Sequence, residues 1–154
     1  MRAIVRSAVL AFVVAALACA DAHDGVMEVL TSMAGALTES SGADGQVVAG
    51  GNVPKFMDAF SKDMPDYDTL KGNVTALVNN AEVSSSILPL TENEQGSTYK
   101  IDLDWLLEVR SLEQDGPLVR RREVVHCELR KEKKHWKIVA LKPLEFFAPP
   151  DLGK

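Results

Sequence analysis

The chain has 154 residues, of which 46% are hydrophobic and 25% are charged, and its formal net charge is −5. Its length suits one domain, and the apolar share is large enough to build a hydrophobic core. An acidic chain without a basic block is a poor candidate for binding nucleic acid or an anionic membrane surface, so we expect neither as a partner.

The N-terminus carries the three parts of a secretory signal peptide. Arg2 and Arg6 are basic, and the apolar run 8–18 that follows contains no charge. This run is too short to span a bilayer, which takes about 20 residues. Two overlapping small-x-small cleavage sites follow, Ala18-Cys19-Ala20 and Ala20-Asp21-Ala22. We therefore predict a signal peptide over residues 1–20, cleavage between Ala18 and Ala22, and one mature domain over residues 21–154.

Cys19 leaves an alternative open. A lipoprotein signal also ends in a cysteine, but its usual box has Leu three residues earlier, where this chain has Ala16. We therefore favour soluble release, into the periplasm or outside the cell, over a lipid anchor on Cys19, and expect no stable membrane insertion. Cys127 is then the only cysteine of the mature chain, so an internal disulfide is excluded and the core must supply the stability.

The first half of the mature chain has helical periodicity. A first helix starts near Asp24 and is broken by residues 40–45, which are small or polar and include two glycines. A second helix is capped by Asn52 with Pro54 in its first turn, and a third is capped by Asp66. The predicted inward residues are Val26, Val29, Leu30, Met33 and Leu37 in the first helix, Phe56, Met57, Phe60 and Met64 in the second, and Tyr67, Leu70, Val74, Leu77 and Val78 in the third.

From Ala81 onward the apolar period changes to two, which predicts strands at about 82–90, 98–110, 118–131 and 135–147. Short connections between successive strands predict an antiparallel meander. The predicted fold class is α+β, with three N-terminal helices packed on the concave face of a curved four-stranded antiparallel meander.

The alternation of side chains predicts which strand residues share a face. A hairpin centred on Asp115 keeps odd-numbered apolar residues opposite one another and sets Trp105 opposite Val125. A two-residue turn at Glu132-Lys133 then sets Val125 opposite Ala140. Continuing this register places Lys142 opposite Glu123.

Several stretches resemble the nuclear transport factor 2-like, or SnoaL-like, superfamily. They are Met64–Lys71, Glu82–Ile87, Arg120–Val125 and Trp136–Val139, with Phe146-Phe147 at the end. The resemblance covers most of the chain after Pro54, and none of these stretches is a catalytic signature. It implies a cone in which the sheet wraps around the helices and leaves a pocket. The superfamily includes isomerases, dehydratases and cyclases as well as non-catalytic binders and scaffolds, so the fold alone does not decide the function.

The candidate site is the mouth of this cone. Arg121 and Glu123 share the parity of inward-facing Val125, and Lys142 is predicted beside Glu123. Such a charged group at the rim of an apolar cavity orients the polar end of a small apolar ligand. The alternative is an ion-pair rim at the open end of the sheet, which contributes little.

Our first functional hypothesis is therefore a non-catalytic ligand-binding or scaffold domain. The alternative is a pocket enzyme of the isomerase or dehydratase kind, with Glu123 as general base and Arg121 or Lys142 as electrostatic support. No acid–base pair of the superfamily's enzymes can be carried over, because the inward positions of the second and third strands are mostly aliphatic.

Other chemistry is not favoured. Asp102 and Asp104 are predicted on the outer face, where a carboxylate stays solvated and finds cross-strand partners such as His126 and Arg130. The three histidines lack the spacing of metal ligands, and Cys127 lies among apolar residues, where a thiol behaves as a small hydrophobe. We predict no metal site and no cofactor.

The outer face carries one apolar anomaly. Leu106, Val124, Val139 and Leu141 have outward parity, and the register brings them side by side. A contiguous apolar patch on a solvated sheet usually marks an interface, so we predict a homodimer through this face.

Overall fold

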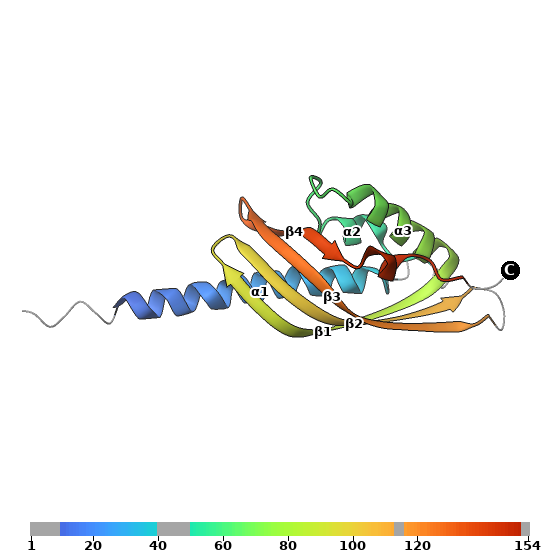
Figure 1. Ribbon diagram of the computed structural model, residues 1–154, viewed down its shortest axis with the longest axis horizontal. Coiled ribbons are helices and arrows are strands. Elements are labelled where there is room, and N and C mark those ends of the chain that lie inside the picture. Colours follow the sequence, from blue (N-terminus) through green and yellow to red (C-terminus); the bar gives the residue numbers. More distant parts are fainter. Residues whose placement is uncertain (1–9, 40–49, 113–115, 152–154) are drawn as a thin grey trace, which may run out of the picture.

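The computed structural model describes residues 10–39, 50–112 and 116–151 (Figure 1). Three features predicted from the sequence lie outside these ranges: the signal-peptide arginines Arg2 and Arg6, the helix break at residues 40–45 and the hairpin centre at Asp115. The elements in chain order are α1 (Leu10–Ala36), α2 (Val53–Met57), α3 (Tyr67–Asn80), β1 (Ala81–Gln95), β2 (Thr98–Ser111), β3 (Leu118–Glu132), β4 (His135–Lys142) and the 3-10 helix η1 (Leu144–Phe147).

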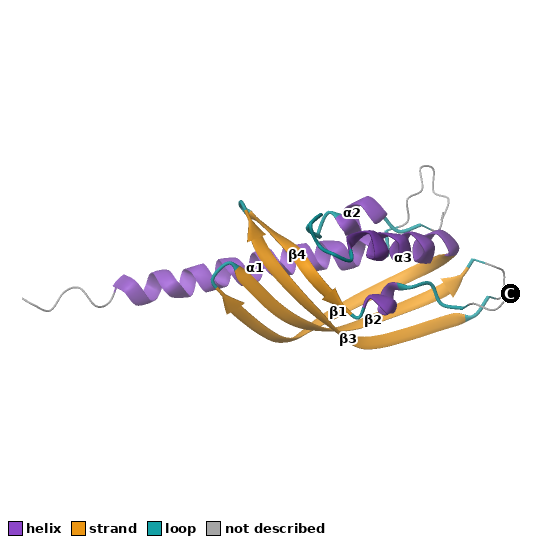
Figure 2. Ribbon diagram, turned by 45° about the horizontal axis from the view of Figure 1, so that its top comes forward, coloured by secondary structure: helices purple, strands orange, loops and turns teal. Residues whose placement is uncertain are grey.

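The predicted α+β order of three helices followed by an antiparallel sheet is confirmed. The described strands form an open sheet in the order β1-β2-β3-β4, in which sequential strands pair. Figures 1 and 2 show that the strands are curved and that α2 and α3 lie on the concave side. One face of the sheet packs with the helices into a continuous core. The buried sheet residues include Ile101, Leu103, Trp105, Leu107 and Val109 in β2, Val125, Cys127 and Leu129 in β3, and Trp136, Ile138 and Leu141 in β4.

The helix α1 starts earlier than the sequence predicts. It runs without a break from Leu10 to Ala36, whereas periodicity places its start near Asp24. The predicted inward residues of this helix are buried except Val29, which is half-buried. Figure 1 shows the first turns of α1 extending beyond the sheet, while its later turns run beside the strands.

The predicted second helix is much shorter than expected. Asn52 caps it as predicted, because its side chain accepts a hydrogen bond from the amide of Lys55 at 3.0 Å. The helix then ends at Met57, since the chain pairs with β4 over Ala59–Ser61. The amide of Ile138 donates to the carbonyl of Ala59, and the amide of Ser61 donates to the carbonyl of Ile138, both at 2.8 Å. This short parallel bridge uses backbone groups that a longer helix would need.

The last helix and the last strand also differ in detail. Asp66 occupies the N-cap position of α3, but its side chain forms no capping hydrogen bond. The strand β4 ends at Lys142 and not at the predicted residue 147. Pro143 follows and has no amide hydrogen for a strand ladder, and the chain turns into η1.

The pairing of β2 with β3 keeps the predicted parity, but β3 is shifted by two residues from the predicted register. Trp105 lies opposite Glu123, and Val125 lies opposite Leu103, so the predicted Trp105–Val125 pair is wrong. The same side chains are nevertheless buried, because a shift by two residues leaves every side chain on its own face.

The pairing of β3 with β4 departs further from the prediction. Glu132 pairs with His135, so the turn is Lys133-Lys134, with Lys133 at a φ of 58°. A β-bulge then places Val139 as an extra residue, because Leu129 pairs with Ile138 and Glu128 with Ala140. A bulge changes which residues face the core beyond it.

Candidate functional site

The predicted rim residues Arg121, Glu123 and Lys142 do not form one group. The bulge in β4 pairs Lys142 with His126, so its predicted place opposite Glu123 is wrong. Lys142 and Glu123 are both exposed.

Arg121 fastens the C-terminal segment to the sheet. Its guanidinium donates a hydrogen bond of 2.9 Å to the carbonyl of Phe146 and another to the carbonyl of Ala148. These bonds hold η1 and the residue after it against β3. Arg121 therefore has a structural task and does not point a free charge at a ligand.

Glu123 lies opposite Trp105 in the β2–β3 pair, yet it is exposed to solvent. General-base catalysis favours a carboxylate that is shielded from water and within reach of a substrate proton. The geometry gives Glu123 no desolvated setting for this role.

Aromatic side chains fill the space between the sheet and the helices. The ring centroids of Trp105 and Phe147 are 5.0 Å apart, those of Phe146 and Phe147 are 5.1 Å apart, and those of Phe56 and Phe147 are 5.8 Å apart. The indole nitrogen of Trp105 donates to Ser85 Oγ at 2.9 Å. A ligand beneath the middle of the sheet would have to displace these rings.

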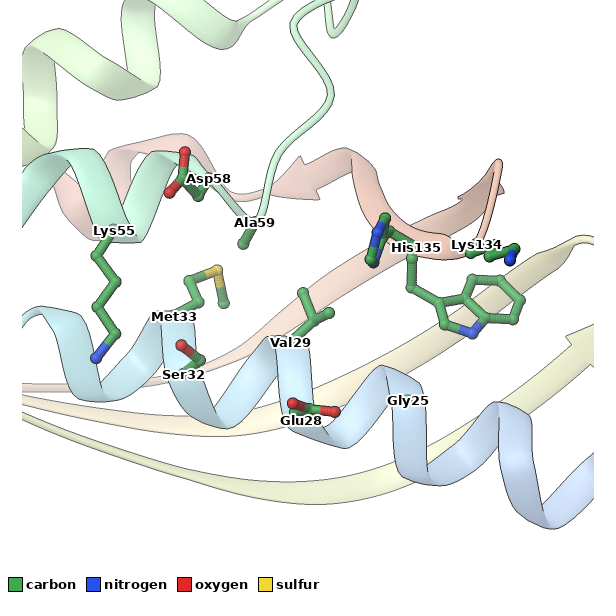
Figure 3. A pocket seen from close by; sticks show the side chains of 11 residues that line it. Gly25, Glu28, Val29, Ser32, Met33, Lys55, Asp58, Ala59, Lys134 and His135 are labelled. Atoms are coloured by element: carbon green, nitrogen blue, oxygen red, sulfur yellow. The ribbon is translucent and has the colours of Figure 1, made fainter.

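A cleft of about 320 Å³ lies elsewhere, between α1, α2 and the β3–β4 turn (Figure 3). Figure 3 shows Val29 and Met33 of α1 pointing across it toward Ala59. The cleft is lined by Gly25, Glu28, Val29, Ser32, Met33, Lys55, Asp58, Ala59, Lys134, His135 and Trp136. Its floor is apolar and its rim carries charged side chains, which is the usual constitution of a small-molecule site.

Trp136 forms one wall of the cleft because Gly25 lets it approach the helix backbone. A Cβ atom on Gly25 would lie 3.1 Å from Cδ1 of Trp136, which is tighter than an ordinary contact. The Trp136 ring also packs edge-on against Tyr99, with centroids 5.9 Å apart, and lies 5.9 Å from the ammonium of Lys131. The wall is thus held in place from several sides.

The charged side chains at the rim of the cleft differ in how accessible they are to a ligand. Lys55 forms an ion pair with Glu39, and this hydrogen bond holds the pKa of Glu39 below its usual value. Lys134 and His135 project from the exposed β3–β4 turn, and Glu28 is exposed on α1. The turn therefore presents the cationic side of the cleft, next to the Trp136 wall.

Sequence reasoning missed this cleft. It combines residues from three segments that are far apart in the chain, and the alternation of side chains does not show where such segments meet. Gly25 was the available signal, since an isolated glycine within a helical pattern often marks a close approach by another group.

A second unpredicted cluster joins α1 to the β1–β2 hairpin. His23 Nδ1 lies 2.8 Å from Glu92 Oε2 and 3.4 Å from the hydroxyl of Tyr99, which donates to the same carboxylate oxygen. Partial burial disfavours the charge on Glu92, but the hydrogen bonds from Tyr99 and His23 outweigh it and lower its pKa. Burial and the neighbouring carboxylate raise the pKa of Tyr99.

The outward position of Asp102 and Asp104 is confirmed. His126 Nδ1 lies 2.6 Å from Asp102, whose other oxygen accepts from Thr91 at 2.8 Å, and these bonds lower the pKa of Asp102. Asp104 accepts hydrogen bonds from Nε and Nη2 of Arg122, which lower its pKa as well. Both carboxylates are therefore held in the ionised form by cross-strand partners. Arg130, the other partner that the sequence suggested, lies against Glu132 instead.

A shallow hollow of about 350 Å³ adjoins the Asp102–His126 pair on the outer face, between Lys100, Glu128, Ala140 and Lys142. Cys127 also contributes to its lining, but the residue is buried and burial raises the pKa of its thiol to about 12. Within residues 10–39, 50–112 and 116–151, no three His, Cys, Asp or Glu side chains gather in a metal-binding group.

The predicted outer apolar patch is only partly present. Val124 is 43% exposed and Leu106 is half-buried, but Leu141 is 2% exposed because the bulge turns it to the core. Its place in an outer patch is therefore wrong. Val139 is the extra residue of the bulge and is half-buried. Leu88 on β1, which is 59% exposed, lies in the same cross-strand row as Val124, on the other side of Asp104.

Comparisons with known proteins show the fold and little more. No protein-family profile and no curated protein sequence matches the chain. A crystal structure from Novosphingobium aromaticivorans, provisionally assigned as an aromatic ring hydroxylase, matches 76% of this chain and 83% of its own, with a TM-score of 0.57 and 15% identity. At that identity the match shows a similar fold only.

A solution structure of a SEC-C motif-containing protein from Rhodopseudomonas palustris matches 59% of this chain and 65% of its own, with a TM-score of 0.38 and 14% identity. So low a score supports no argument. In the described part of the chain, no helix has the length and apolar character needed to cross a membrane.

Proposed function

We propose that this chain is an exported, non-catalytic binding domain that holds a small molecule in the cleft between α1, α2 and the β3–β4 turn. The observation that carries the proposal is the cleft itself, whose apolar floor of Val29, Met33 and Ala59 lies beneath a charged rim. Its volume of about 320 Å³ is at the lower end of the range for small-molecule sites.

The ligand of this site is a small apolar molecule with an anionic end. Trp136 offers a fixed aromatic wall for the apolar part. Lys134 and His135 stand beside that wall on the exposed turn. The rim acids lie opposite, Glu28 on α1 and Asp58 directly after α2. An anionic end is therefore best placed at the turn.

The enzyme alternative has weaker support. It assigns the chemistry to Glu123, with Arg121 or Lys142 beside it. Glu123 is exposed, and the guanidinium of Arg121 donates hydrogen bonds to two backbone carbonyls. Lys142 lies opposite His126 in the β3–β4 ladder. These three positions do not converge on a reacting atom.

We also propose that the domain belongs to the nuclear transport factor 2-like superfamily, with its cone-like shape. Support comes from the order of three helices and a curved four-stranded meander and from the fold match over three quarters of the chain. The proposed assembly is a homodimer through the outer sheet face. Leu88, Leu106 and Val124 supply its apolar contacts in place of Leu141.

Binding of 8-anilinonaphthalene-1-sulfonate, an aromatic anion, tests the cleft. Titration calorimetry of the wild type is compared with Ser32→Tyr, which fills the cleft, and with Thr31→Tyr, which adds the same side chain to an exposed neighbouring position of α1. We expect one saturable site that Ser32→Tyr weakens at least about tenfold and Thr31→Tyr leaves unchanged. Equal binding by all three proteins, or by none of them, contradicts the proposal.

A further inference from the structure

The hollow of about 350 Å³ on the outer face of the sheet lies over three strands, β2, β3 and β4. Two adjacent cross-strand rows surround it, with Asp102, His126 and Lys142 in the first row and Lys100, Glu128 and Ala140 in the second. Ala140 has the shortest of these side chains, so it leaves room between its longer neighbours. The hollow shares no lining residue with the cleft between α1, α2 and the β3–β4 turn.

The first row orients the imidazole of His126. Thr91 Oγ1 donates to Oδ2 of Asp102 at 2.8 Å, and Oδ1 of the same carboxylate lies 2.6 Å from Nδ1 of His126. Both oxygens of Asp102 are therefore engaged. The other ring nitrogen, Nε2, forms no hydrogen bond to a residue in the described part of the chain. An imidazole in its cationic form donates from both nitrogens, so His126 can bond Asp102 and an anion at the same time.

Two lysines stand on either side of this imidazole. Lys142 lies directly opposite His126 on β4, and Lys100 lies diagonally from it on β2. Both lysines are exposed, and neither forms a hydrogen bond or an ion pair with another residue of the ranges 10–39, 50–112 and 116–151. Directly opposite and diagonal neighbours in a sheet have Cβ atoms about 5–8 Å apart, within reach of long side chains. The three nitrogens can therefore meet one group above the hollow.

We propose that this hollow binds a tetrahedral oxyanion, namely phosphate, either free or as the terminal group of a small monoester. Three cationic groups on three strands suit an anion with at least three acceptor oxygens better than a carboxylate, which has two. Hydrogen bonds between ionised partners are about twice as strong as those between neutral ones. The lining has no aromatic wall, unlike the cleft beside Trp136, so the two sites take different ligands.

One carboxylate in the hollow opposes an anion. Glu128 is half-buried and lies opposite Lys100 in the second row. Its charge repels a bound anion, whereas the carboxylate of Asp102 is already bonded to His126 and Thr91. Removal of the Glu128 charge should therefore strengthen binding, and removal of a lysine charge should weaken it. Opposite signs from two neighbouring side chains are the mark of a site at this place.

The test is an NMR titration of the 15N-labelled protein with sodium phosphate at constant ionic strength, with sodium chloride as the reference salt. We expect saturable shift changes at the amides of His126 and Ala140. Lys142→Gln and His126→Gln should each weaken binding at least about threefold, and Glu128→Gln should strengthen it about twofold. Lys71→Gln, which removes the same charge from an exposed position of α3, should leave the affinity unchanged.

A parallel titration with glycerol 2-phosphate identifies the source of the phosphate group. Tighter binding of the monoester assigns an organic phosphate, tighter binding of inorganic phosphate assigns the free ion, and either order supports the site. Shifts that chloride reproduces, shifts centred on Lys134 and His135, or weaker binding by Glu128→Gln would overturn the proposal. Each of these outcomes leaves the proposed cleft standing, because that site is tested with an aromatic anion and has its own lining residues.

Discussion

The sheet contains stretches of regular pairing and stretches interrupted by a bulge, and the two kinds obey the alternation of side chains differently. Where β2 and β3 pair from Thr98 to Arg110, alternation is unbroken and the odd-numbered apolar residues are buried. In β4 and near Pro89 of β1, a bulge shifts the register. The bulges bring Leu141 to the core and Glu92 beneath the edge of α1, so one extra residue moves a side chain to the other face.

The regular stretch is expected to give the largest effect. Trp105→Ala removes a fully buried side chain that contacts Phe147 and donates to Ser85. We expect it to destabilise the protein by about 3–5 kcal/mol, the usual cost of such a truncation. Urea denaturation measures the loss, and Trp105→Phe, which keeps a ring, should lose less. A loss below about 1 kcal/mol for Trp105→Ala would place this residue outside the core.

The bulge in β4 is tested by two identical substitutions on opposite faces. Leu141→Ala should cost about 2–4 kcal/mol, because the bulge buries Leu141. Leu106→Ala on the outer face of the regular stretch is the matched control and should cost less than half as much. If Leu106→Ala is the more costly change in urea denaturation, the bulge does not invert the faces.

The bulge in β1 is tested through the pH dependence of stability. Glu92 has a lowered pKa because Tyr99 and His23 bond its carboxylate, despite partial burial. A lowered pKa stabilises the fold above the ordinary glutamate pKa of about 4.3, and this contribution is lost as the pH falls through the lowered value. Glu92→Gln should therefore cost about 1–2 kcal/mol at pH 7 and much less near pH 3.

Unfolding of wild type and Glu92→Gln across that pH range measures the difference between the two proteins. Glu82→Gln, the same substitution at an exposed position of β1, is the matched control. A difference that stays constant from pH 7 to pH 3 would mean that the charge of Glu92 does not contribute.

The smallest effect on the protomer is expected at Val124, on the outer face of the regular stretch. Val124→Glu should change the stability of the protomer by no more than about 1 kcal/mol, because the side chain is exposed and only the carboxylate of Asp104 on β2 opposes the new charge. The proposed dimer would nevertheless dissociate, since the new carboxylate meets its copy near the two-fold axis. Light scattering at matched concentration checks this, and a monomeric wild type at tens of micromolar contradicts the dimer.

Much of the fold is readable from the sequence because helices and strands have different apolar periods. The inward residues of α1 and β2 follow from those periods alone, and the parity of β3 survives even a wrong register. The bulge at Val139 and the end of β4 before Pro143 were harder to predict, because a bulge and a strand end depend on which backbone groups find hydrogen-bond partners. The short α2 has the same cause, because Ala59 and Ser61 bond to β4 instead of continuing a helix.

The candidate site was much less predictable than the fold. The prediction that Arg121, Glu123 and Lys142 form one rim depended on the β3–β4 register, which a single extra residue, Val139, changes. The cleft depends on the angle at which α1 crosses the β3–β4 turn, which no local pattern encodes. Gly25 and Trp136 each have a local sequence signal, but the contact between them is tertiary.

The binding site is tested most directly by an NMR titration of 15N-labelled protein with 8-anilinonaphthalene-1-sulfonate. We expect shift changes at the amides of Gly25, Val29 and Ala59 and at the indole of Trp136, with little change at Trp105. Changes confined to Val124 and His126 on the outer face, or shifts of the Trp105 indole that follow the titration, would contradict a ligand site in this cleft.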